Sequence, residues 1–232
     1  MISKMPAGYL LMVLLLARES ESKSPASNER GLEIISMAKA ASGGNAWDRL
    51  EIMHDVGKAI LQTGEVLQYE HWGDLRTLRT RAGSGAGDMF FDGSAAYKCQ
   101  TVTCDSRTKL DSTEMRGAAY LNCFGFFFPT RFPASFQYKG TRVDGGVLYD
   151  VVEVSPTGLP AADIWINHQS HLIFRAIDTH GRFRAELTDY RKVSGVMIPF
   201  TEVSDGVTIS SERVTFEMAG AVSFSLPAGH QP

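Results

Sequence analysis

The stretch Arg182-Phe-Arg-Ala-Glu-Leu-Thr188 alternates polar and apolar residues along its whole length. Successive side chains of an extended strand point to opposite faces, so its apolar and charged residues fall on different faces. A second stretch, Arg213-Val-Thr-Phe-Glu-Met218, repeats the pattern. The alternation predicts an antiparallel sheet with one face in water and the other covered by protein. The two apolar faces hold Phe183, Ala185, Leu187, Val214, Phe216 and Met218.

Similar short segments extend through most of the chain. They are separated by Gly, Asp, Asn or Pro, which is typical of strands joined by tight turns. We count about twelve such segments, enough for a long antiparallel meander. The predicted strands are 52–61, 66–72, 75–82, 88–91, 95–101, 135–143, 147–155, 162–167, 171–178, 182–190, 196–203 and 207–218.

Only two regions show helical spacing of apolar residues. One lies within residues 29–50, where Gly43-Gly44 interrupts it, and the other runs from about residue 111 to 124. With few helices to cover so many strands, a strongly curved sheet wrapped around the helices is the most economical arrangement. The sequence therefore predicts an α+β, mostly β fold, with an unclosed, strongly curved antiparallel sheet around two or so helices.

Composition and charge narrow the function classes. Of the 232 residues, 44% are hydrophobic and 21% are charged, as in an average globular protein. The 23 Lys and Arg against 26 Asp and Glu give a net charge of -3, which supplies no basic field for a phosphate backbone. We therefore expect no nucleic-acid partner.

The N-terminus has the layout of a secretory signal peptide. Lys4 precedes the apolar run 8–17, and polar residues follow. The run is too short to cross a bilayer, which needs about 20 apolar residues, so a permanent membrane span is the weaker interpretation. The expected division is a signal peptide 1–17, a polar leader 18–28, one folded domain 29–220 and a C-terminal tail 221–232.

Three stretches carry a resemblance to a known family. They are Tyr149-Asp-Val-Val-Glu-Val-Ser-Pro-Thr-Gly158, Asp163-Ile-Trp-Ile-Asn-His-Gln-Ser-His-Leu-Ile-Phe-Arg175 and Leu187-Thr-Asp-Tyr-Arg-Lys-Val-Ser-Gly-Val-Met-Ile-Pro-Phe200. This part of the chain resembles the LolA/LolB-like superfamily of lipoprotein-sorting domains. The helix ending at Ser42-Gly-Gly44, followed by Trp47, is similar to variants of this domain found ahead of aspartyl-protease-like chains.

The resemblance implies a periplasmic protein with an unclosed β-barrel that holds its helices in the concave face. It also implies a cavity for an acyl chain or the lipid moiety of a lipoprotein. We therefore expect a non-enzymatic binding protein with no cofactor. The alternative is a structural or regulatory accessory domain with a filled core, acting on an envelope peptidase or another protein partner.

The stretch 124–133 is the most suggestive part of the chain because it gathers Phe and Pro residues. It has two interpretations, an ordinary core beneath the sheet or the wall of a lipid cavity, since apolar side chains line both. Sheet residues from the alternating strands would form the other wall. The cavity candidates are Phe124, Phe127, Phe128, Phe183, Leu187, Ile198, Phe200, Val214 and Phe216.

No residue set in the sequence predicts catalysis or metal binding. Cys99 and Cys104 flank a predicted turn and are either a disulfide of an exported protein or two free thiols. Cys123 falls on the apolar side of the second helix, where a buried, unreactive thiol is expected. His168 and His171 occupy a turn between strands rather than a helix, so we interpret them as turn residues.

Overall fold

The sheet of this protein runs without interruption from one edge of the molecule to the other. The computed structural model describes residues 25–84, 87–100, 103–105, 112–178 and 184–225. In that part of the chain, thirteen strands form one sheet in the order β6-β5-β4-β3-β2-β1-β13-β12-β11-β10-β9-β8-β7. Every strand pairs antiparallel with its neighbours. The expected signal peptide, residues 1–17, lies outside the described residues.

The helical elements are α1 (Pro25–Ala41), η1 (Gly44–Arg49), α2 (Ser112–Asn122) and η2 (Gly125–Phe127). The strands are β1 (Ile52–Ile60), β2 (Val66–Asp74), β3 (Thr80–Ser84), β4 (Gly87–Phe91), β5 (Ala96–Gln100), β6 (Thr103–Asp105), β7 (Ala134–Asp144), β8 (Val147–Pro156), β9 (Ala162–Asn167), β10 (Ile173–Asp178), β11 (Arg184–Val193), β12 (Val196–Ser204) and β13 (Val207–Glu217).

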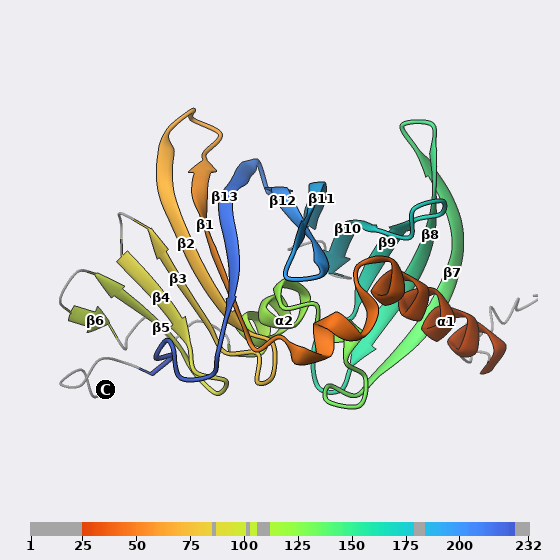
Figure 1. Ribbon diagram of the computed structural model, residues 1–232, viewed down its shortest axis with the longest axis horizontal. Helices are drawn as coiled ribbons and strands as arrows, with labels where there is room; N and C mark the ends of the chain where they lie inside the picture. Colours follow the sequence, from red (N-terminus) through yellow and green to blue (C-terminus); the bar gives the residue numbers. More distant parts are fainter. Residues whose placement is uncertain (1–24, 85–86, 101–102, 106–111, 179–183, 226–232) are drawn as a thin grey trace, which may run out of the picture.

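The chain builds the sheet in two meanders that meet at the centre. Strands β1 to β6 proceed outward to one edge, α2 carries the chain across to the opposite edge, and β7 to β13 return to pair with β1. The edge strands β6 and β7 do not pair with each other, so the sheet stays open. It curves so that α2 lies between its two arms while α1 crosses β7 (Figure 1). The predicted fold class is confirmed.

The first helix is joined to the sheet by a tight turn. The Met197 N–H of β12 donates to the Ser42 carbonyl oxygen at 2.8 Å. Gly43 adopts a φ of 128°, and a Cβ there would lie 2.7 Å from the Gly195 carbonyl oxygen. Only glycine fits so close to another backbone in this conformation. The turn thus fixes the end of α1 against β12 and begins η1, which carries Trp47. Helix α1 itself begins at Pro25, within the expected polar leader.

Residues 75–79 were predicted as part of a strand, and this is wrong. The Asp74 carboxylate accepts hydrogen bonds from the N–H groups of Arg76 and Thr77, and from the Thr77 hydroxyl at 2.6 Å. An Asp side chain that satisfies the following N–H groups favours a turn over a strand. Leu75 and Leu78 are buried beneath this turn, and β3 begins only at Thr80.

The segment predicted as a C-terminal tail is partly packed. Phe224 is only 2% exposed, and the Arg79 guanidinium lies 5.1 Å from the centre of its ring. The described chain therefore stays in contact with the folded body beyond residue 220.

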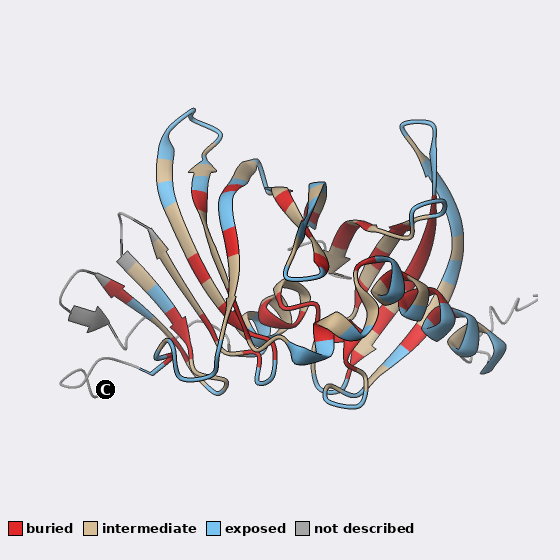
Figure 2. Ribbon diagram, viewed as in Figure 1, coloured by how far each residue is buried: buried red, intermediate tan, exposed pale blue. Residues whose placement is uncertain are grey.

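The core lies between the helices and the concave face of the sheet (Figure 2). Trp47 is fully buried there, with its ring centre 5.1 Å from that of Phe124 and 5.5 Å from that of Phe127. Phe216 of β13 closes the same cluster at 6.5 Å from Trp47. These offset and edge-on ring contacts join η1, η2 and the sheet centre into one apolar cluster.

Candidate functional site

Two hollows adjoin helix α2, and they are the candidate ligand sites. One lies between α2 and the ends of β9 and β10, and we call it the α2 cavity. The other lies between the C-terminal end of α2 and the concave face of the central strands, and we call it the sheet cavity. Leu121 lines both, so a single side chain forms part of the wall of each.

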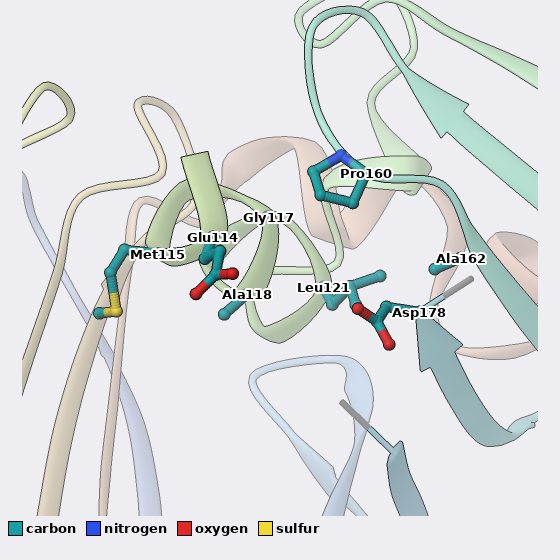
Figure 3. Close-up of a pocket in the computed structure, with 8 residues that line it drawn as sticks. All are labelled: Glu114, Met115, Gly117, Ala118, Leu121, Pro160, Ala162 and Asp178. Atoms are coloured by element: carbon teal, nitrogen blue, oxygen red, sulfur yellow. The ribbon is translucent and has the colours of Figure 1, made fainter. Parts of the chain in front are cut away.

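The α2 cavity has a volume of about 210 Å³ and mostly apolar walls. Glu114, Ala118 and Leu121 recur at helical spacing on the α2 face that borders it. Figure 3 shows Leu121 directed toward Ala162 and Asp178, the paired ends of β9 and β10. The cavity is lined by Glu114, Met115, Gly117, Ala118, Leu121, Pro160, Ala162 and Asp178.

The sheet cavity is smaller, at about 100 Å³, and it combines apolar walls with a polar floor. Asp55 on β1 and His71 on β2 are direct cross-strand partners, which places their Cβ atoms within about 5.5 Å. Tyr69 lies two residues from His71 on the same face of β2, and Glu202 contributes from β12. The lining residues are Met53, Asp55, Tyr69, His71, Leu121, Asn122, Phe124, Ala185, Leu187, Ile198, Pro199, Glu202 and Ile209.

Burial shifts the titration of these polar groups. It raises the pKa of Asp55 to about 6, against a hydrogen bond from the Ser211 hydroxyl at 2.9 Å, which lowers it. Burial, helped by the charge of Asp55, raises the pKa of Glu202 to about 7. Burial lowers the pKa of His71 to about 4 and raises that of Tyr69. The floor therefore holds carboxyl groups that ionise near neutral pH beside an uncharged imidazole.

The cavity candidates from the sequence fall into three groups. Phe124, Leu187 and Ile198 line the sheet cavity. The remaining described candidates line neither cavity and belong to the core cluster or pack against it. They are Phe127, Phe128, Phe200, Val214 and Phe216. Phe183 lies outside the described residues.

Sequence reasoning missed the polar floor. Asp55 could have indicated it from the sequence. It lies two residues after Met53 in β1, so both side chains are on the strand face that points into the protein. A charged residue in the inward phase of a strand is unusual unless it is paired or functional. Its proximity to Glu202 could not be foreseen, because it depends on β13 pairing with both β1 and β12.

The cysteines and histidines have separate surroundings. Cys99 and Cys104 are direct cross-strand partners on β5 and β6, and Cys99 is disulfide-bonded. The side chain of Cys104 lies outside the described residues, so its pairing with Cys99 stays a prediction. Cys123 is free and fully buried, and burial raises its pKa to about 12, as expected for an unreactive thiol.

His168 belongs to a surface network, with its Nδ1 atom 2.8 Å from the Asp150 carboxylate. The same carboxylate accepts a hydrogen bond from the Tyr138 hydroxyl at 3.0 Å. In the described part of the chain, no group of three or more His, Cys, Asp or Glu side chains is arranged to hold a metal ion.

Comparison with solved structures identifies the architecture. The chain is similar to a putative outer membrane lipoprotein-sorting protein domain from Vibrio parahaemolyticus, with a TM-score of 0.53 and 12% identity over 83% of this chain and 94% of that one. The chain has a LolA/LolB-like fold. The chain is also similar to a DUF1329 family protein from Desulfovibrio piger, with a TM-score of 0.54 and 10% identity over 85% of this chain and 95% of that one.

Comparison of the sequence with known families and curated proteins finds no match. Within the residues that the structure describes, none of the helices has the length and apolar character needed to cross a bilayer.

Proposed function

We propose that this chain is an exported, periplasmic binding protein that holds an acyl chain or the lipid moiety of a lipoprotein beside α2, without catalysing a reaction. The observation that carries the proposal is the α2 cavity, a mostly apolar hollow of about 210 Å³ inside a lipoprotein-sorting-like fold. Burial of apolar ligand surface there supplies the affinity, at roughly 25 cal/mol per Å².

The architecture supports reversible uptake at this position. Helix α2 is held at its C-terminal end, where Tyr120 and Cys123 are buried, while the residues that face the cavity are half-buried or exposed. Asp178 ends β10 and Ala162 begins β9, so the opposite wall is the end of two paired strands. A chain entering between helix and strand ends breaks no sheet hydrogen bond.

The proposal is tested by filling the α2 cavity. Ala118→Phe places a large ring in it, whereas Arg116→Phe adds the same ring at an exposed position of the same helix and serves as the matched control. Uptake of a neutral fluorescent apolar probe, such as N-phenyl-1-naphthylamine, should fall at least five-fold in Ala118→Phe and stay unchanged in Arg116→Phe. Equal uptake by both variants and the parent chain, or no uptake by any of them, contradicts the proposal.

A failure of the parent chain to take up the probe would favour the alternative function. If the parent chain takes up no apolar probe, the accessory-domain alternative becomes the better account, and a search for a protein partner in the envelope follows.

A further inference from the structure

The floor of the sheet cavity presents hydrogen-bond acceptors that the protein leaves unused. The Oδ1 atom of Asp55 is buried and has no hydrogen-bond partner in the described structure, although Oδ2 accepts from Ser211. His71 is only 7% exposed, lines the cavity and makes no hydrogen bond or ion pair with any described residue. Glu202 also lines the cavity without such a partner in the described chain.

Unsatisfied polar groups of this kind are uncommon in folded proteins. A buried acceptor without a partner costs about 1–3 kcal/mol, so most are paired in native structures. One such buried acceptor, the Oδ1 atom of Asp55, lies on β1, and the side chains of His71 on β2 and Glu202 on β12 line the same cavity beside the apolar side chains of Met53 and Ile198. A cavity with apolar walls and a few convergent polar groups is the usual form of a small-molecule site.

The charges around the floor of the sheet cavity determine which kind of polar ligand group can bind there. Among the described residues that line the sheet cavity, none is a Lys or an Arg. The ionisable groups that act on Asp55, Glu202, His71 and Tyr69 are one another, His54 on the opposite face of β1 and the thiol of Cys123. An anionic end, such as a carboxylate or a phosphate, would meet carboxyl groups with no cation to offset the repulsion.

We propose that the sheet cavity binds the cationic end of an amine-headed amphiphile, a primary ammonium group on an apolar chain. An ammonium group has three N–H donors, which match the carboxylates of Asp55 and Glu202 and a ring nitrogen of His71. The carbons next to the ammonium group pack against Met53, Phe124 and Ile198, and the rest of the apolar chain passes Leu121, which lines both cavities, toward the α2 cavity. This inference rests on the proposed function, because it assigns the polar end of the ligand whose apolar part that function requires.

The titration of the floor agrees with this assignment. At pH 7.5, above the raised pKa values of about 6 for Asp55 and about 7 for Glu202, both carboxyl groups are largely ionised. The pKa of His71, lowered to about 4, leaves its imidazole neutral and able to accept a hydrogen bond. Charge-assisted hydrogen bonds in a partly dehydrated cavity are stronger than those on an exposed surface.

The test compares three ligands of equal chain length at pH 7.5: octylamine, 1-octanol and octanoate. Isothermal titration calorimetry on the full chain should show that octylamine binds at least ten-fold more tightly than octanoate, with octanol between them. Asp55→Asn and Glu202→Gln should each weaken octylamine binding at least five-fold while changing octanol binding less than two-fold. Glu212→Gln, which removes an exposed carboxylate of β13, is the matched control and should change neither.

The outcomes separate this inference from the proposed function. Equal binding of the three ligands, or octylamine binding that is unchanged in both carboxyl variants, overturns the inference and leaves the proposed function standing. If none of the three ligands binds, both fall. The two carboxyl variants lie on different strands, so misfolding of one still leaves the other as a test.

Discussion

The Trp47 indole N–H donates to both the carbonyl oxygen and the hydroxyl oxygen of Ser42, at 3.1 Å each. Ser42 is the first residue after α1. Its carbonyl oxygen also accepts a hydrogen bond from the Met197 N–H of β12. The side chain of Trp47 is fully buried against the aromatic cluster. One residue pair therefore links the first helix, the centre of the sheet and the core.

Removing the indole N–H should weaken this link. Trp47→Phe keeps an aromatic ring but loses the donor and part of the packed volume, so we expect unfolding free energy to fall by about 2–3 kcal/mol. Urea denaturation followed by circular dichroism measures the loss. A change below about 0.5 kcal/mol would show that the pair does not contribute to stability.

The two neighbouring glycines of the turn should respond differently to the same substitution. Gly43→Ala forces a Cβ against Gly195 and Val196 at a φ of 128°, and should cost about 3 kcal/mol. Gly44 has a φ of 57°, and no atom of the described residues lies within 4 Å of where a Cβ would stand, so Gly44→Ala should cost about 1 kcal/mol. Equal losses in thermal or urea unfolding would contradict the close approach of the turn to β12.

The carboxyl group of Asp55 should make stability depend on pH. Its folded pKa of about 6 lies above the unfolded value near 4, so the folded state binds more protons between these values and stability falls as pH rises through this window. Asp55→Asn should therefore be more stable than the parent at pH 7.5, by about 1–2 kcal/mol, and no more stable near pH 4. Urea unfolding midpoints of the parent protein and of Asp55→Asn, measured at several pH values, test this prediction. The same pH dependence of stability in the two proteins would refute it.

His71 should make folding stability depend on pH in the opposite direction to Asp55. Its folded pKa of about 4 lies below the unfolded value near 6.5, so the unfolded chain binds more protons in this range and stability falls as pH drops from 6.5 to 4. His71→Gln should flatten this acidic limb by about 2 kcal/mol. The same urea series measures the limb, and an unchanged acidic slope would show that His71 does not titrate as proposed.

The candidate disulfide between Cys99 and Cys104 should give a small stabilisation. The loop that it closes is short, and loops of this size contribute about 2 kcal/mol in the chain-entropy account. A non-reducing peptide map of the protein from the envelope fraction should contain the linked peptides, and Cys99→Ala with Cys104→Ala should lower the unfolding free energy by about that amount. Two freely alkylated thiols in addition to Cys123 would contradict the pairing.

Most of the fold could be predicted because it depends on local patterns. The alternation at Arg213–Met218 and the turn residues between segments indicated nearly every strand, and helical spacing indicated α2. The strand predicted across 75–79 failed because one carboxylate, Asp74, supplies enough hydrogen bonds to favour a turn over extended backbone.

Much less of the candidate site could be predicted from the sequence. Core side chains and cavity walls have the same apolar character, so Phe127 and Phe200 could not be told apart from the cavity-lining Phe124 and Ile198. The polar floor depends on which strands become neighbours, a consequence of β13 closing onto β1 that no local pattern reports.

The hollows beside α2 are proposed to hold an acyl chain or lipid. This proposal is tested most directly by native mass spectrometry of the protein purified from the envelope fraction, before and after delipidation. We expect an added mass that delipidation removes and that returns when the stripped protein is incubated with an amine-headed or neutral lipid. A bare polypeptide mass in both samples, with no mass gained on incubation, would contradict it.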